Sequence, residues 1–88
     1  MQDIKEILSK SFKQAIIALF DHEIDVFEIQ PTRKEFEGDY TLVVFPLLRQ
    51  LKSNPQELAT KIGTYVCDHR AEVQDFNVVK GFLNLSLS

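Results

Sequence analysis

The chain of 88 residues has little of three residue types that mark specialised folds, with one cysteine, three glycines and no tryptophan. A single cysteine excludes an internal disulfide, so cysteine usage does not argue against a reducing compartment. Three scattered glycines leave no glycine-rich loop of the kind that cradles phosphates. No apolar run approaches the roughly 20 residues that span a bilayer, and the acidic N-terminus lacks the apolar stretch of a signal peptide. We therefore expect a cytoplasmic protein without a membrane segment.

Positive charge is also scarce, because 10 Lys and Arg accompany 13 Asp and Glu and give a net charge of −3. Bulk attraction to phosphates scales with Lys and Arg contacts, so this composition disfavours a protein that binds nucleic acid mainly through charge. A nucleic-acid partner would have to be bound through local contacts, with most of the affinity supplied elsewhere in a larger protein. The hydrophobic content of 44%, which includes seven phenylalanines, suffices for the core of a single domain over residues 1–88.

Hydrophobic periodicity predicts an α+β fold with the element order α-β-β-α-α-β-β. Apolar residues at spacings of three and four predict an amphipathic first helix over residues 2–20. Pro46 suits the first turn of a helix, and Asn54-Pro55 with Glu57 three residues after the asparagine predicts the capped start of another. The expected strands span residues 24–30, 39–45 and 72–79, with a fourth after Gly81. Short links favour a mostly antiparallel four-stranded sheet with the helices packed on one face.

The last strand carries the most informative functional pattern. Strand residues alternate between faces, which separates Leu83, Leu85 and Leu87 from Phe82, Asn84 and Ser86. Because the leucines supply a core face, we expect Phe82 and Asn84 on the open face, where a ring can stack on a base and an amide can bond to its edge. Lys80, Arg33 and Lys34 are the candidates for nearby phosphate contacts. Alternation alone leaves open the alternative that Phe82 is covered and belongs to the core.

Two other chemistries are less well supported. Cys67, His69 and the distant His22 could be metal ligands, but zinc sites usually show two close-spaced ligand pairs, so an ordinary surface helix is favoured. The loop over residues 33–39 is rich in ionisable groups that could perform acid–base catalysis, although opposite charges in a loop are more often a solvated turn. The chain has no recognisable nucleophile motif. We expect no catalytic residue and no metal site in this chain.

Several short motifs follow one another along the chain: Pro31-Thr32-Arg33, Gly38-Asp39-Tyr40-Thr41, Asn54-Pro55-Gln56-Glu57-Leu58-Ala59 and Gly81-Phe82-Leu83-Asn84. Their order and spacing resemble the N-terminal additional domain of bacterial-type arginyl-tRNA synthetases over nearly the whole chain. The resemblance implies a tRNA-recognition module that contacts the D-loop at the outer corner of tRNA. In such a module Phe82 would stack on a D-loop base and Asn84 would bond to it.

The resemblance also suggests roles for the turn residues. Gly38, Asp39 and Tyr40 would shape the chain near the tRNA side, and we expect Gly81 in the tight turn before Phe82. Family members often continue the Gly-Asp-Tyr element with small residues and an asparagine. This chain instead has Thr41-Leu42-Val43. We therefore assign no polar RNA contact to residues 42 and 43.

The class I signatures that bind ATP are absent, so the resemblance implies that the catalytic and anticodon-binding domains lie outside this chain. Arginine, ATP and magnesium chemistry would belong to the full-length enzyme, an ATP-dependent arginine–tRNA ligase that aminoacylates tRNA-Arg. The chain alone is expected to be non-catalytic and to need no cofactor, with tRNA and its own catalytic domain as partners. The residues themselves leave open, as the main alternative, a protein–protein interaction domain that docks through the open sheet face. A small stand-alone hydrolase that uses the acidic loop is the third possibility.

Overall fold

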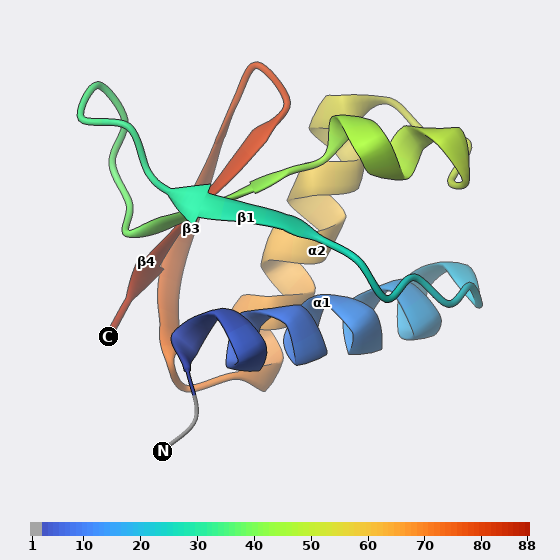
Figure 1. Cartoon of the computed structure of the whole chain (residues 1–88), viewed down its shortest axis with the longest axis horizontal. Coiled ribbons are helices and arrows are strands. Elements are labelled where there is room, and N and C mark those ends of the chain that lie inside the picture. Colours follow the sequence, from blue (N-terminus) through green and yellow to red (C-terminus); the bar gives the residue numbers. More distant parts are fainter. Residues whose placement is uncertain (1–2) are drawn as a thin grey trace.

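The computed structural model describes residues 3–88, which form two α-helices, one 3₁₀-helix and four strands (Figure 1). In chain order they are α1 (Ile4–Phe20), β1 (Glu28–Pro31), β2 (Tyr40–Val43), η1 (Phe45–Arg49), α2 (Pro55–His69), β3 (Val73–Val79) and β4 (Phe82–Leu87). The strands form one antiparallel sheet in the order β1-β2-β4-β3. The predicted fold class and element order are confirmed. Neither α-helix of this part of the chain has the length and apolar character to cross a membrane.

The hydrophobic core lies between one face of the sheet and the two α-helices. Its fully buried members include Leu8, Phe12, Ala15 and Ile16 from α1, Leu58, Ile62 and Val66 from α2, and Leu42, Leu83 and Leu85 from the sheet. The helical members recur at spacings that line one side of a helix, and the three leucines share one side of the sheet. Both helices therefore cover the same face, and in Figure 1 the loop between β1 and β2, drawn green, lies away from both.

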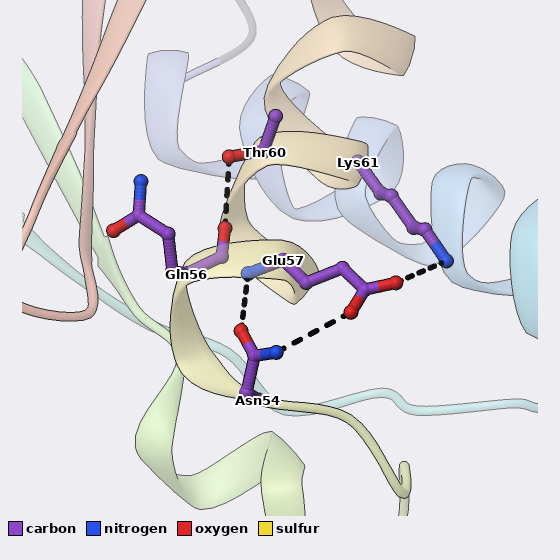
Figure 2. A network of polar contacts seen from close by, with 5 residues as sticks. All are labelled: Asn54, Gln56, Glu57, Thr60 and Lys61. Atoms are coloured by element: carbon purple, nitrogen blue, oxygen red, sulfur yellow. Dashed lines mark hydrogen bonds and ion pairs between the residues drawn. The ribbon is translucent and has the colours of Figure 1, made fainter.

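The start of α2 is fixed by the capping residues that the sequence predicts. The Oδ1 atom of Asn54 accepts a hydrogen bond from the backbone N–H of Glu57 at 2.7 Å, and its Nδ2 atom donates to Glu57 Oε2 at 3.3 Å (Figure 2). Glu57 Oε1 also pairs with Lys61 Nζ at 3.1 Å. One turn on, the Thr60 hydroxyl donates to the Gln56 carbonyl at 2.8 Å. The first turn of α2 thus has its free N–H groups partly satisfied by a side chain.

Replacing Asn54 by Ala should lower the free energy of unfolding by about 1 kcal/mol, because the N–H of Glu57 loses its acceptor. Urea denaturation of the two proteins measures the change. Gln56→Ala is the matched control, since Gln56 is exposed in the same turn and its side chain points away from the capping contacts (Figure 2). Equal losses in the two variants would show that the cap contributes nothing specific.

The two strand boundaries that differ from the sequence prediction by more than one residue do so for one shared reason. A strand from residue 24 is predicted, but β1 begins at Glu28, whose partner in β2 is Val43. After Val43 the chain enters η1, so residues 24–27 have no strand to pair with. β2 likewise ends at Val43 instead of residue 45, and Phe45, the last residue of the predicted strand, is 47% exposed. Residue 2, predicted within the first helix, lies outside the described residues.

Candidate nucleic-acid interface

Phe82 lies on the face of the sheet that the helices leave open. The β2–β4 register pairs Val43 with Phe82 and Thr41 with Asn84, and paired residues of antiparallel strands point to the same side. Leu83 and Leu85 point to the other side and are fully buried in the core, whereas Phe82 is only half-buried. The predicted outward position of Phe82 is therefore confirmed, and the alternative that it belongs to the core is wrong. Its role in binding stays a prediction.

Two side chains from distant parts of the sequence pack on Phe82, and we call Phe82, Phe45 and Arg33 the aromatic platform. The Phe45 and Phe82 rings meet edge to face, with centroids 6.2 Å apart and planes at 83°. Arg33 Cζ lies 5.7 Å from the centroid of the Phe82 ring, within the range of a cation–π contact. The platform thus combines an aromatic surface with one positive charge.

Gly81 allows Phe45 to reach this position. The glycine has φ +80°, and a Cβ atom on it would lie 2.6 Å from Cζ of Phe45. A larger residue at this turn would both strain the backbone and displace the ring. Sequence reasoning missed Phe45 as a site residue. One sequence signal could have identified it. Phe45 follows Val43 by two residues, and residues two apart on a strand point to the same face, which here is the face of Phe82.

The three predicted cationic residues are exposed, and Arg33 makes the cation–π contact with Phe82. Arg33 contacts the ring, whereas Lys34 follows it in the β1–β2 loop and Lys80 occupies the β3–β4 turn with φ 49°. Within residues 3–88 these three side chains form no ion pair. Their charge is partly balanced by Glu35 and Glu37 in the same loop. The positive charge at this face is therefore local and modest.

Asn84 is on the predicted side of the sheet, but the prediction that it is open to a partner is wrong. Its exposed fraction is 0%, and its amide is already bonded to Thr41 at 2.6 Å and to Asn77 at 2.9 Å. The β1–β2 loop covers it, because a Cβ atom on Gly38 would lie only 3.2 Å from the Asn84 Cβ atom. Alternation along a strand predicts the side to which a side chain points, but it does not predict whether another segment of the chain covers that side chain.

The Gly38-Asp39-Tyr40 element holds this covering loop against β4. The backbone N–H of Asp39 donates to the Leu85 carbonyl at 2.7 Å, and Asp39 Oδ2 accepts from the N–H of Leu87 at 2.8 Å. Gly38 adopts φ +141°, a conformation that L side chains rarely adopt. Tyr40 begins β2 opposite Leu85 and packs against the core. These contacts agree with a structural role for the element.

The two histidines considered as metal ligands are hydrogen-bonded to other groups, and the cysteine packs against the hydrophobic core. His69 Nδ1 bonds to the Tyr65 carbonyl at 2.8 Å, whereas His22 bonds to Gln50 at 3.0 Å. Burial raises the pKa of the Cys67 thiol, and nearby acidic groups add to the shift, so less of the metal-binding thiolate is present. No three metal-ligating side chains gather into a site in the described part of the chain.

Both the sequence and the fold of this chain match known proteins. The family described as "Arginyl tRNA synthetase N terminal domain" matches residues 4–87. The arginine–tRNA ligase of Flavobacterium psychrophilum is 46% identical over 97% of this chain, and that of Phocaeicola vulgatus is 43% identical over 98%. The chain spans only 16% and 15% of those two proteins. The structure of Thermus thermophilus arginyl-tRNA synthetase matches 98% of this chain and 14% of its own, with a TM-score of 0.78 and 23% identity, and supports the fold.

Proposed function

Since this chain belongs to the arginyl-tRNA synthetase N-terminal domain family, we propose that it is the tRNA-recognition module of a larger arginine–tRNA ligase. The curated relatives are about six times as long as the matched segment, as the 16% coverage indicates. Aminoacylation of tRNA-Arg in the cytoplasm, with its ATP and magnesium, would then take place in other domains of the parent enzyme. The module would supply a contact to tRNA and would pack beside its own catalytic domain.

The observation that carries this proposal is the aromatic platform on the sheet face opposite α1 and α2. An aromatic ring stacks on any base, and a guanidinium can stack on a base or bind a phosphate. One stacked base contributes about 1–3 kcal/mol, which suits a contact that adjusts the affinity of a larger complex. The net charge of −3 fits the same picture, because the module lacks the bulk positive charge that would bind RNA by itself.

We place an unpaired D-loop nucleotide on Phe82, with Arg33, Lys34 and Lys80 available to the adjoining phosphates. Bases in RNA loops can be splayed out and stacked on aromatic side chains, whereas paired bases cannot. Asn84 is fully buried by the β1–β2 loop, so this arrangement assigns it no direct contact with the base edge. Binding at the platform would therefore depend on an accessible base more than on its identity.

Abasic substitutions at each D-loop position of tRNA-Arg test the proposed contact in the parent enzyme. We expect one position to raise the Michaelis constant for tRNA by about fivefold or more, because about 1 kcal/mol or more of stacking is lost. Abasic sites in the TΨC loop serve as the control. If no D-loop position affects the Michaelis constant, the D-loop contact is refuted.

A second candidate function is supported by one observation, the 47% exposure of Phe45 beside Phe82. Two neighbouring phenylalanines can form a small hot spot for another protein surface, including the parent enzyme's own catalytic domain. In that case Phe45→Ala would weaken domain docking and lower the melting temperature of the parent enzyme, and all abasic tRNAs would behave like the intact one.

A further inference from the structure

A continuous chain of hydrogen bonds lies beneath the β1–β2 loop, and we call it the loop clasp. It joins Thr32 to Thr41 at 3.0 Å, Thr41 to Asn84 at 2.6 Å, Asn84 to Asn77 at 2.9 Å, and Asn77 to the Glu37 carbonyl at 2.7 Å. Asn84 and Thr41 are 0% and 3% exposed. Both ends of the clasp belong to the loop, and its middle belongs to β2, β4 and β3.

The donors and acceptors of the loop clasp can be assigned in only one way if every hydrogen bond is to form. The Glu37 carbonyl only accepts, so Asn77 must turn its NH₂ group toward it and its oxygen toward Asn84. Asn84 then donates to Asn77, and its own oxygen accepts the Thr41 hydroxyl hydrogen. That hydroxyl has a single hydrogen, so the Thr32 hydroxyl donates to Thr41 in turn. Removing any member leaves a partly or fully buried polar group without its partner.

The loop closed by the clasp carries two of the three candidate cations. Arg33 and Lys34 directly follow Thr32, and the Arg33 guanidinium already lies over the Phe82 ring at 5.7 Å. Side chains and loops that must be ordered at the moment of binding reduce affinity, whereas a loop ordered beforehand does not. The ends of this loop are tied to the sheet in the free protein.

We propose that the loop clasp holds Arg33 and Lys34 in position for RNA before RNA arrives, and that Asn84 is a positioning residue. The inference rests on the proposed tRNA function and refines its site. Thr32 and Asn77 then affect tRNA affinity without touching tRNA, because they act through the loop and its arginine. Asn84 joins the Thr32–Thr41 part of the clasp to the part formed by Asn77 and the Glu37 carbonyl. This buried amide thus has a role other than bonding to a base.

A matched pair at residue 32 of the parent enzyme tests this inference. Thr32→Val removes the hydroxyl and keeps the size of the side chain, whereas Thr32→Ser keeps the hydroxyl. We expect Thr32→Val to raise the Michaelis constant for tRNA about threefold to tenfold with kcat unchanged, the range that one lost hydrogen bond supplies. The Michaelis constant of Thr32→Ser should stay within about twofold of that of the unmodified enzyme. Asn77→Ala removes the bond to the Glu37 carbonyl at the other end of the clasp, and its Michaelis constant should resemble that of Thr32→Val.

Proteolysis reports on the loop independently of tRNA. Trypsin cleaves after Arg33 and Lys34, so a released loop should be cut several-fold faster in Thr32→Val than in Thr32→Ser, as measured by mass spectrometry of the cleaved product. Thr60→Val is the control, because Thr60 bonds within α2, outside the clasp. In an Arg33→Ala/Lys34→Ala background, Thr32→Val should raise the Michaelis constant no further, since both side chains that the clasp positions are gone.

An unchanged cleavage rate in Thr32→Val, or an equal further loss in the Arg33→Ala/Lys34→Ala background, would overturn the positioning role. Such a result would leave the Phe82 contact intact if an abasic D-loop position still weakens binding. Conversely, faster cleavage without any D-loop sensitivity would show that the clasp holds the loop and that the proposed tRNA contact fails. The two proposals can therefore fail separately.

Discussion

Replacing Phe82 by Ala in the parent arginine–tRNA ligase should raise the Michaelis constant for tRNA by about 5- to 100-fold, with kcat within about twofold. The range follows from about 1–3 kcal/mol for one stacked base, at about 1.4 kcal/mol for each factor of ten. The proposed contact would lie outside the reacting centre and would be present before and during the reaction, so its loss would reduce binding without slowing chemistry. Steady-state aminoacylation kinetics with varied tRNA measure the effect.

Phe82→Leu separates stacking from simple packing. Leucine keeps an apolar side chain beside Phe45 but has no π face, so we expect most of the loss seen with alanine. Leu19→Ala is the surface control, because Leu19 is 39% exposed on α1, which covers the opposite face of the sheet. Full activity toward tRNA in a folded Phe82→Ala enzyme would exclude the stacking role. Rescue by leucine would instead favour an apolar protein contact.

Replacing Asn84 by Asp should lower the free energy of unfolding by about 3–5 kcal/mol at pH 7, the largest effect expected on stability. The new carboxylate would be fully buried, would face the Asn77 oxygen and would have no hydrogen to donate to it. Asn54→Asp is the matched control, because the same change at an exposed helix cap keeps the acceptor for the Glu57 N–H. The new charge near the helix N-terminus is favourable, and it offsets the lost bond to Glu57 Oε2 and the repulsion between the two exposed carboxylates, so we expect a small net change. Urea denaturation of both variants gives the comparison.

The Asn84→Asp loss should depend on pH with a definite sign. Burial raises the pKa of the new carboxyl in the folded protein above its unfolded value of about 3.9. Below pH 4 both states hold the proton, and the difference from the parent protein is smallest. As the pH rises between the two pKa values, the unfolded state ionises first and stability falls by up to about 1.4 kcal/mol per unit. A loss that is equal at pH 3.5 and pH 7 would mean that the carboxyl is not buried.

Local sequence signals predicted a large part of this fold. Asn54, Pro55 and Glu57 marked the start of α2 within the residues that form its first turn. Alternation in Phe82–Leu87 separated the buried leucines from the outward ring, because neighbours along a strand point to opposite faces whatever the rest of the chain does. The order of four short motifs indicated the family, which the match over residues 4–87 shows.

The sequence by itself therefore determined the order of the elements and separated Phe82 from the leucines of its strand, since both depend on residues close together in the chain. The order of the four motifs along the chain indicated the family. Tertiary structure alone decided that Asn84 is buried, that Phe45 is exposed and that Arg33 lies over Phe82. These outcomes depend on where the β1–β2 loop closes over β4 and where η1 leaves the sheet. Contacts between segments tens of residues apart are set by global packing, and no local pattern encodes what covers a given side chain.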